Sequence, residues 1–354
     1  MLARERSCVT NVESGRMRAA VYREKRRLVV EERPVPAPGP HEVVLRVSHC
    51  GVCGSDLHIV MEGWGRPDSI GGHEYSGRIT ALGSAVTNWE LGACVVGGPA
   101  AGCGRCEYCT THRPSLCASH GTPGIAEFQG AFAEYVRVHE TQLRRVPAGL
   151  SLREAALAEP LAVALHGVTL SQIAPGRRAL VTGAGPIGML TLAALRAKGI
   201  DDVTVSEPSA TRRAAAVRVG ASQVVTPDDL PRPRMPFEFA LPGFDAVFEC
   251  SGNAAAVESA LRQLKRGGTL LLVGTGMAKP RLDMNRMILG ELRVIGSYNY
   301  DEHGIDDALA LLASGKLPTG VLLEQGDVGL DGLASAMERL AAGELGGKLL
   351  VAPS

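Results

Sequence analysis

Four cysteines lie within fifteen residues of this 354-residue chain and restrict its fold more than any other feature. They form the pattern Cys103-x2-Cys106-x2-Cys109-x7-Cys117. Thiolates at such short spacing on one loop can close a tetrahedron around zinc with no open position, which is typical of a structural zinc site. Unligated or disulfide-paired cysteines and an iron–sulfur cluster are the alternatives. In a long chain whose first residues show no apolar signal core, the cluster favours metal binding over a disulfide framework.

The length and composition predict two domains and a small-molecule partner. With 45% hydrophobic residues the chain can build two cores, and it is too long for one ordinary domain. The formal net charge is zero, so no overall field attracts nucleic acid or an anionic membrane. No apolar run is long enough to span a membrane. We therefore expect a cytoplasmic protein.

The pattern of apolar, glycine and proline residues changes at about residue 160. Residues 17–160 consist of short β-rich runs broken by Gly and Pro, which predict a mostly β domain. Residues 161–303 alternate apolar strands with Ala- and Leu-rich helices, as a doubly wound parallel sheet requires. Residues 304–354 are expected to return to the first domain, and residues 1–16 to form a disordered extension. The proline-rich stretch Thr226 to Gly243 predicts an irregular surface loop.

A glycine-rich motif lies directly after one of these strands and opens a helix. It has the form GxGxxG and consists of Gly183, Ala184, Gly185, Pro186, Ile187 and Gly188. Small residues let the backbone approach a pyrophosphate, and the helix N-terminus favours its negative charge. The motif in this context predicts a dinucleotide-binding domain.

An acidic residue at the end of the next strand bears on the choice of dinucleotide. A carboxylate at Glu207 can accept hydrogen bonds from both ribose hydroxyls and would repel a 2′-phosphate, so NAD is preferred over NADP. Arg212 and Arg213 lie just downstream, and NADP stays possible if Glu207 swings away and they accommodate the 2′-phosphate.

A second possible metal site combines a Cys-Gly-Ser-Asp-Leu-His run with a Gly-His-Glu run. A catalytic zinc needs soft or borderline protein ligands and one open position, which Cys53, His73 and a carboxylate can supply. The Ser55 hydroxyl could pass a proton on, and His58 titrates near neutrality and could deliver it to water. Glu74 follows His73 directly. Each residue alone has an ordinary structural explanation, but the combination favours catalysis.

Glu159 interrupts an otherwise apolar run. A buried carboxylate is costly unless a cation or metal lies beside it, so a position near the zinc explains this residue. The alternative is a carboxylate at a helix start.

Together these residues resemble the zinc-containing medium-chain alcohol dehydrogenases. The resemblance covers Met17 to Val351 and implies a GroES-like β domain split around a Rossmann domain, with the structural zinc lobe at about residues 97–120. Cys53 and His73 would be ligands of the catalytic zinc, and Glu74 and Glu159 would share the remaining role. Because a carboxylate replaces the cysteine of the classical enzymes, the chain looks more like the polyol or sorbitol, butanediol and threonine dehydrogenases.

The resemblance also implies a cofactor contact and an oligomer. Lys348 matches a basic position that reaches the cofactor pyrophosphate in relatives, the alternative being a solvated lysine at a strand end. Subunits of the family often pair through an edge strand of the Rossmann sheet, and residues 293–298 fit that place. A homodimer or homotetramer is expected.

We therefore expect a zinc-dependent oxidoreductase with two zinc ions per subunit, which transfers hydride between a secondary alcohol or polyol and NAD. The proton would leave by Ser55, through the cofactor ribose, to His58. An NADP-linked carbonyl reductase of the same fold is the alternative. A non-catalytic dinucleotide-binding protein is disfavoured, because all the candidate catalytic residues are present together.

Overall fold

The computed structural model describes residues 9–10, 15–99, 102–119 and 129–354. The chain divides into two compact units, each built from more than one segment. Unit 1 comprises Met1–Glu159, Gln325–Ala342 and Leu349–Ser354, and unit 2 comprises Pro160–Glu324 and Gly343–Lys348. Residues 304–324, which the sequence assigned to the first domain, belong to unit 2 because α9 (Gly304–Ala313) and α10 (Thr319–Leu322) lie there.

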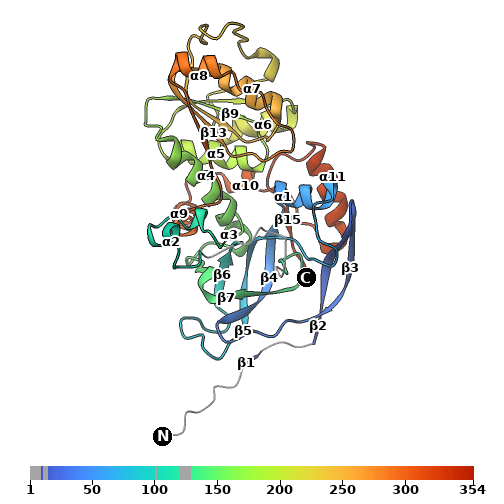
Figure 1. The fold of residues 1–354 in the computed structure, drawn as a ribbon. Helices are drawn as coiled ribbons and strands as arrows, with labels where there is room; N and C mark the ends of the chain where they lie inside the picture. The colour runs from blue at the N-terminus through green and yellow to red at the C-terminus, as the bar shows by residue number, and fades with distance from the viewer. Residues whose placement is uncertain (1–8, 11–14, 100–101, 120–128) are drawn as a thin grey trace. The chain divides into compact units, whose positions relative to one another are not determined.

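Unit 2 contains a six-stranded sheet in which all neighbouring strands are parallel (Figure 1). Its strand order is β11-β10-β9-β12-β13-β14. From β9 the next strands along the chain, β10 and β11, are added toward one edge of the sheet. From β12 the next strands, β13 and β14, are added toward the other edge, so the direction of strand addition reverses between β9 and β12. In such sheets ligands bind at the carboxyl ends of the strands beside the reversal. The strands are β9 (Arg178–Thr182), β10 (Asp202–Ser206), β11 (Gln223–Val225), β12 (Phe244–Glu249), β13 (Leu264–Leu272) and β14 (Arg293–Gly296).

The central strands of this sheet are continuously apolar because both faces are covered. Ala179, Leu180 and Val181 of β9 are fully buried. The helices of the unit are α4 (Ala158–Ser171), α5 (Pro186–Ala197), α6 (Ala210–Val219), α7 (Ala254–Gln263) and α8 (Met284–Gly290). The predicted doubly wound sheet is confirmed.

The proline-rich stretch before β12 is irregular, as the sequence predicted. Apart from the 3-10 turn η4 (Pro227–Asp229), residues 226–243 contain no helix or strand. The buried Arg286 of α8 holds this loop through carbonyl oxygens, including that of Met235 at 2.6 Å from its Nη2. A guanidinium therefore satisfies carbonyl groups that a crossover helix would have paired internally.

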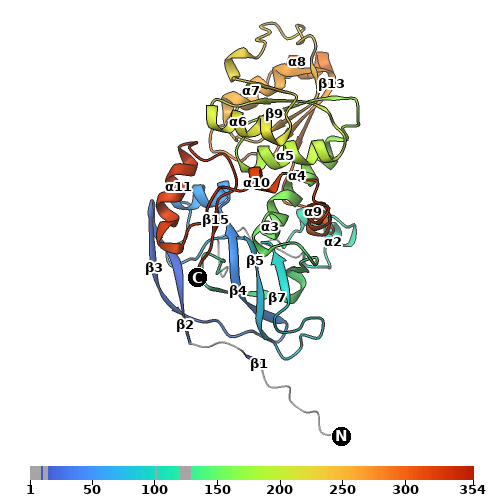
Figure 2. The same ribbon diagram turned by 180° about the vertical axis from the view of Figure 1, so that it is seen from behind.

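Unit 1 contains a mostly antiparallel sheet with the path β15-β4-β5-β6-β8, and the hairpin β2-β3. The C-terminal strand β15 lies beside β4 (Figure 2). The predicted mostly β domain is confirmed. The elements are β1 (Val9–Thr10), β2 (Arg16–Glu24), β3 (Arg27–Pro34), β4 (Glu42–Gly51), β5 (Glu74–Leu82), β6 (Cys94–Gly97), β7 (Tyr135–His139), β8 (Leu143–Arg145), β15 (Leu350–Val351), with helices α1 (Gly54–Leu57), α2 (Glu107–Thr110), α3 (Leu152–Ala155) and α11 (Leu333–Ala341).

The N-terminal extension lies mostly outside the described residues. Within it, Val9 and Thr10 form a short strand that pairs with Leu82 and Ala81 of β5. Arg16 already belongs to β2. Over the parts of the chain that the structure describes, no helix has the length and apolar character needed to cross a membrane.

Candidate functional site

Cys53, His73 and Glu74 meet in one group in unit 1. Each offers one ligand atom, and these atoms all lie within 4.8 Å of one another. The meeting follows from the sheet register: Gly51 at the end of β4 pairs with Glu74 at the start of β5, so Cys53, two residues beyond β4, reaches His73. Glu74 is fully buried. The thiol, imidazole and carboxylate are a donor set that suits zinc, with a fourth position left open.

Asp56 holds the two halves of this group together. Its side chain is almost fully buried and accepts hydrogen bonds from the Cys53 amide at 2.9 Å and the Gly72 amide at 3.4 Å. One carboxylate oxygen lies 3.9 Å from His73 Nδ1. The sequence motifs did not assign a role to Asp56, although an acid three residues after a helix cap is a recognisable capping signal. The carboxylate therefore joins the segments that carry Cys53 and His73 through their backbone amides, and it places a negative charge beside the imidazole.

The group attracts a positive charge. Burial alone would lower the pKa of His73, but the Asp56 carboxylate, the Cys53 thiol and, more weakly, Glu159 raise it well above its usual value. In the absence of a metal, this imidazole would therefore be in its protonated, positively charged form. A site that gathers this much negative charge around one imidazole fits a divalent cation.

Glu159 lies close to the group but is not one of its members. It is in the first turn of α4, is 5% exposed, and acts electrostatically on His73. Of the two carboxylates that the sequence left open, Glu74 is the one placed among the candidate ligand atoms.

Ser55 and His58 lie about one turn apart in the helical segment that begins directly after Cys53. Ser55 is in α1, and His58 begins the π-helical turn η1 (His58–Glu62). His58 Nδ1 is 3.0 Å from Glu62 Oε1, and its ring stacks on Trp64 with 4.7 Å between the ring centroids. Trp64, which the sequence treated as a possible pocket wall or as packing, is half exposed and packs against this imidazole. Sequence reasoning missed Glu62, although its position four residues after His58 on a helix would have indicated the contact.

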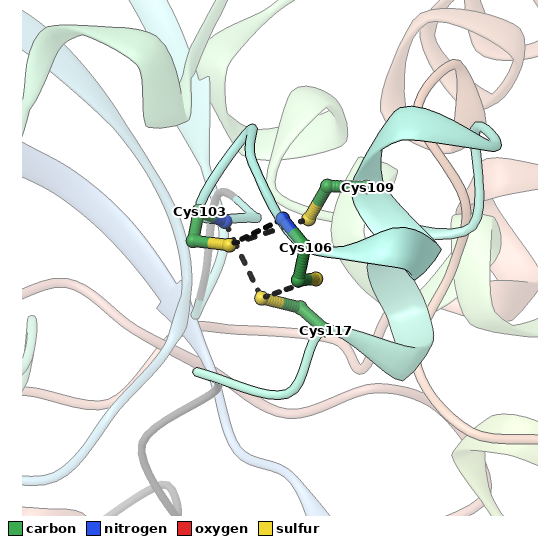
Figure 3. A group of neighbouring side chains, drawn as sticks. All are labelled: Cys103, Cys106, Cys109 and Cys117. Atoms are coloured by element: carbon green, nitrogen blue, oxygen red, sulfur yellow. Dashed lines mark hydrogen bonds between the residues drawn. The ribbon is translucent and has the colours of Figure 1, made fainter.

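The sulfur atoms of Cys103, Cys106, Cys109 and Cys117 point toward one another (Figure 3). The Sγ atoms of Cys103 and Cys109 are 4.0 Å apart, and those of Cys106 and Cys117 are 3.9 Å apart. A disulfide needs about 2.05 Å, whereas zinc–sulfur bonds of about 2.3 Å in a tetrahedron place the sulfurs about 3.8 Å apart. The four thiols are therefore arranged to hold a metal ion.

The ionisation of these thiols also indicates a cation. Backbone N–H groups of Arg105 and Cys106 lower the pKa of Cys103 to about 6. Burial and the neighbouring thiols raise the pKa of Cys109 to about 12. The two shifts have opposite signs, so Cys103 favours the thiolate while Cys109 keeps its proton unless a cation lies beside it.

The glycine-rich motif has the geometry of a pyrophosphate cradle. Gly183 has φ +87, and a Cβ on Gly188 would lie 1.8 Å from the Gly183 carbonyl oxygen, so neither position accepts a side chain. Gly185 caps α5 and has open space on its side-chain face, while Pro186 occupies the first turn. The backbone at the N-terminus of α5 is thus accessible to an anionic group, as dinucleotide binding requires.

Glu207 lies at the carboxyl end of β10 and is 3% exposed. Its carboxylate accepts hydrogen bonds from the Ala184 amide at 2.7 Å and the Ser209 amide at 2.8 Å. Arg213 Nη1 donates to the Glu207 carbonyl oxygen at 2.8 Å. The carboxylate is therefore held beside the glycine-rich motif, where a ribose would meet it.

The short segment Gly343–Lys348 belongs to unit 2 and ends at Lys348, and Arg212 of α6 binds its backbone. Arg212 Nε donates to the Leu345 carbonyl oxygen at 2.9 Å, and this contact fixes the segment to α6. Lys348 is 1% exposed. The alternative of a solvated lysine at a strand end is wrong, because the side chain is buried. The backbone of Lys348 forms a bridge with that of Leu323.

Comparisons with known proteins agree with this geometry. Residues 39–148 match the alcohol dehydrogenase GroES-like domain, and residues 186–314 match the zinc-binding dehydrogenase domain. The sorbitol dehydrogenase of Bacillus subtilis is 31% identical over 94% of this chain and 95% of its own length.

Two solved structures share the fold of the chain. A zinc-binding dehydrogenase from Sinorhizobium meliloti, bound to NADP, is 33% identical and superposes with a TM-score of 0.85 over 96% of this chain and 100% of its own. The 2R,3R-butanediol dehydrogenase of Bacillus subtilis is 29% identical, with a TM-score of 0.84 over 96% of this chain and 100% of its own.

Proposed function

Because the chain belongs to the zinc-containing medium-chain alcohol dehydrogenase family, we propose that it transfers hydride reversibly between a polyol or another secondary alcohol and NAD. The observation that carries this proposal is the group formed by Cys53, His73 and Glu74, because three protein ligands leave a fourth position for substrate. The similarity to sorbitol and butanediol dehydrogenases supports secondary alcohols as the substrate class.

Cys53, His73 and Glu74 would hold the catalytic zinc. A zinc ion bound there would supply Lewis-acid chemistry that lowers the pKa of an alcohol hydroxyl. Asp56 joins the segments that carry Cys53 and His73, and its carboxylate lies beside the His73 imidazole. Glu159, almost buried beside His73, adds negative charge that favours cation binding.

Ser55 and His58 would carry the proton away from the alcohol. The Ser55 hydroxyl accepts a hydrogen bond from the reacting hydroxyl and donates its own proton onward. His58 delivers the proton to water, since its imidazole is partly exposed. Glu62 and Trp64 restrict the rotation of this imidazole through the Nδ1 contact and the stacked ring.

The test of this function is metal content by mass spectrometry, combined with NAD and NADP reduction in the presence of secondary alcohols and polyols. Two zinc ions per chain and NAD-dependent oxidation of at least one alcohol are expected. A chain with one zinc ion or none, and no turnover on any alcohol, would contradict the proposal.

The choice of NAD depends on Glu207 in this proposal. A hydrogen bond to a charged group contributes about 1.5–3 kcal/mol, so Glu207→Ala is expected to lower kcat/KM for NAD about 10- to 100-fold. The value for NADP should change little or rise, because the repulsion of a 2′-phosphate is removed. The measurement is the ratio of kcat/KM for the two cofactors, with Glu238→Ala, in the proline-rich loop, as a control. An unchanged ratio would show that Glu207 does not set the choice of cofactor. A ratio in favour of NADP in the unsubstituted chain would support the alternative of an NADP-linked carbonyl reductase, and one similar structure is bound to NADP.

The chain is also proposed to form a homodimer, or a homotetramer built from dimers. β14 is the last strand of the sheet in unit 2, and its second edge pairs with no strand among the described residues. An edge of this kind, with Val294 and Ile295 half-buried, is a template for pairing with a second copy. Size-exclusion chromatography at micromolar concentration is expected to give two or four times the mass of one chain, and a monomer would refute this.

A further inference from the structure

Glu249, the last residue of β12, is a fully buried carboxylate that the proposed function does not use. Its two oxygens accept hydrogen bonds from the loop that follows the strand. One oxygen accepts from the Ser251 amide at 2.9 Å and from the Ser251 hydroxyl, and the other accepts from the Gly252 amide at 3.0 Å. A buried carboxylate is costly unless donors surround it. These three donors therefore tie the conformation of the loop to the carboxylate.

The loop that Glu249 holds lies directly against the loops that follow β9 and β13. A Cβ on Gly183 would lie 2.9 Å from the Ser251 Cβ, and a Cβ on Gly252 would lie 2.0 Å from the Thr275 carbonyl oxygen. Both glycines thus leave room that the neighbouring loop fills. The three loops meet at the carboxyl ends of β9, β12 and β13, beside the reversal of strand order where ligands bind in such sheets.

The strand order indicates which part of a dinucleotide would meet this loop. Glu207, directly after β10, is expected to bind the ribose of the adenosine half, and the glycine-rich motif after β9 is expected to bind the pyrophosphate. β12 lies on the other side of β9 from β10. A dinucleotide that starts at β10 and crosses β9 therefore places its nicotinamide half at the loops after β12 and β13.

We propose that Glu249 is a positioning residue that holds residues 250–253 in the conformation that binds the nicotinamide half of the cofactor. Glu249 is fully buried whereas Ser251 is exposed, so the loop, and not the carboxylate, would contact the cofactor. A loop that is correctly placed in only a fraction of the molecules lowers the apparent affinity by that fraction. The inference rests on the proposed function, because it requires that unit 2 binds NAD.

The first test is Glu249→Gln in the full-length chain. Glutamine keeps the size of the side chain but offers only one acceptor oxygen, so a buried N–H or O–H donor loses its partner. The Kd for NADH, measured by fluorescence titration, is expected to rise about 10-fold or more. The Kd for 5′-AMP, which resembles the adenosine half alone, should stay unchanged in isothermal titration calorimetry. A general loss of stability would not distinguish the two ligands.

Two further variants are the controls. Glu238 also accepts from two backbone amides of its own loop, those of Arg234 and Met235, but this loop precedes β12 and so lies at the opposite end of the strand. Glu238→Gln should therefore leave both Kd values unchanged. Glu207→Ala should weaken NADH and 5′-AMP together, because both ligands contain the adenosine ribose.

Ser251→Ala tests the same loop in case Glu249→Gln does not fold. The Ser251 hydroxyl donates to Glu249, and its removal leaves the two backbone donors in place. The Kd for NADH should rise about 3-fold, with that for 5′-AMP unchanged. An unchanged Kd for NADH in a folded Glu249→Gln variant, or in Ser251→Ala if the first variant does not fold, would overturn the proposal. Equal weakening of NADH and 5′-AMP would overturn it too.

The same measurements separate this inference from the proposed function. An unsubstituted chain that binds neither NADH nor 5′-AMP and oxidises no alcohol would refute both. An unsubstituted chain with NAD-dependent turnover, together with a Glu249→Gln variant that matches it in both Kd values, would refute the role of Glu249 alone.

Discussion

Cys53→Ser is expected to remove the catalytic zinc and to lower kcat/KM for alcohol oxidation by at least about a thousand-fold. A bound metal stabilises developing charge by several kcal/mol, and each 1.36 kcal/mol is a factor of ten in rate. The serine hydroxyl is a poor substitute, since zinc prefers the softer thiolate. The zinc content should fall from two ions per chain to one, because the four cysteines that begin at Cys103 are untouched.

Cys94→Ser is the matched control for this prediction. Cys94 is also an unpaired, partly buried cysteine of unit 1, and it belongs to neither candidate metal group. It should keep both zinc ions and its turnover. A Cys53→Ser variant that retains two zinc ions and full activity would remove Cys53 from the ligand set.

Cys106→Ser is expected to empty the four-cysteine site and to lower Tm by about 10 °C or more. The free energy of metal binding at a structural site is also free energy of folding, and in a unit of this size each kcal/mol corresponds to about 2–4 °C. Within residues 102–119 only Ser115 and Cys117 are buried, so apolar packing contributes little to the stability of this lobe. We therefore expect a bound metal to supply most of that stability.

Thermal unfolding of Cys106→Ser, with metal analysis of the same sample, checks this prediction, and Cys94→Ser again serves as control. The catalytic zinc should remain bound to Cys53 and His73. If Cys106→Ser loses one zinc ion without any fall in Tm, the site is not structural.

The sequence was informative where a function depends on residues close together in the chain. The spacing of Cys103 to Cys117 predicted a site whose four sulfur atoms do meet. The glycines at 183 and 188 predicted a tight turn before a helix, and both positions exclude a side chain. Local spacing carries this information because a turn or a short loop alone sets the geometry.

The sequence was less informative where contacts join distant segments. Nothing near Lys348 indicated that its backbone would pair with that of Leu323 or that its side chain would be buried. That Glu74 lies in the group with Cys53 and His73 depends on the register of β4 against β5, which the sequence does not specify. Such contacts depend on how the whole chain packs, which periodicity does not specify.

The last strand of the chain has a consequence for how the protein is made. Leu350 and Val351 pair with Gly51 and Cys50, and the Leu349 carbonyl oxygen accepts from the Val52 amide at 3.0 Å. The backbone that leads directly into Cys53 is therefore completed, during synthesis, only after β15 has left the ribosome. A polypeptide cut before Leu349 would contain every candidate metal ligand but would lack the strand that supports the backbone next to Cys53.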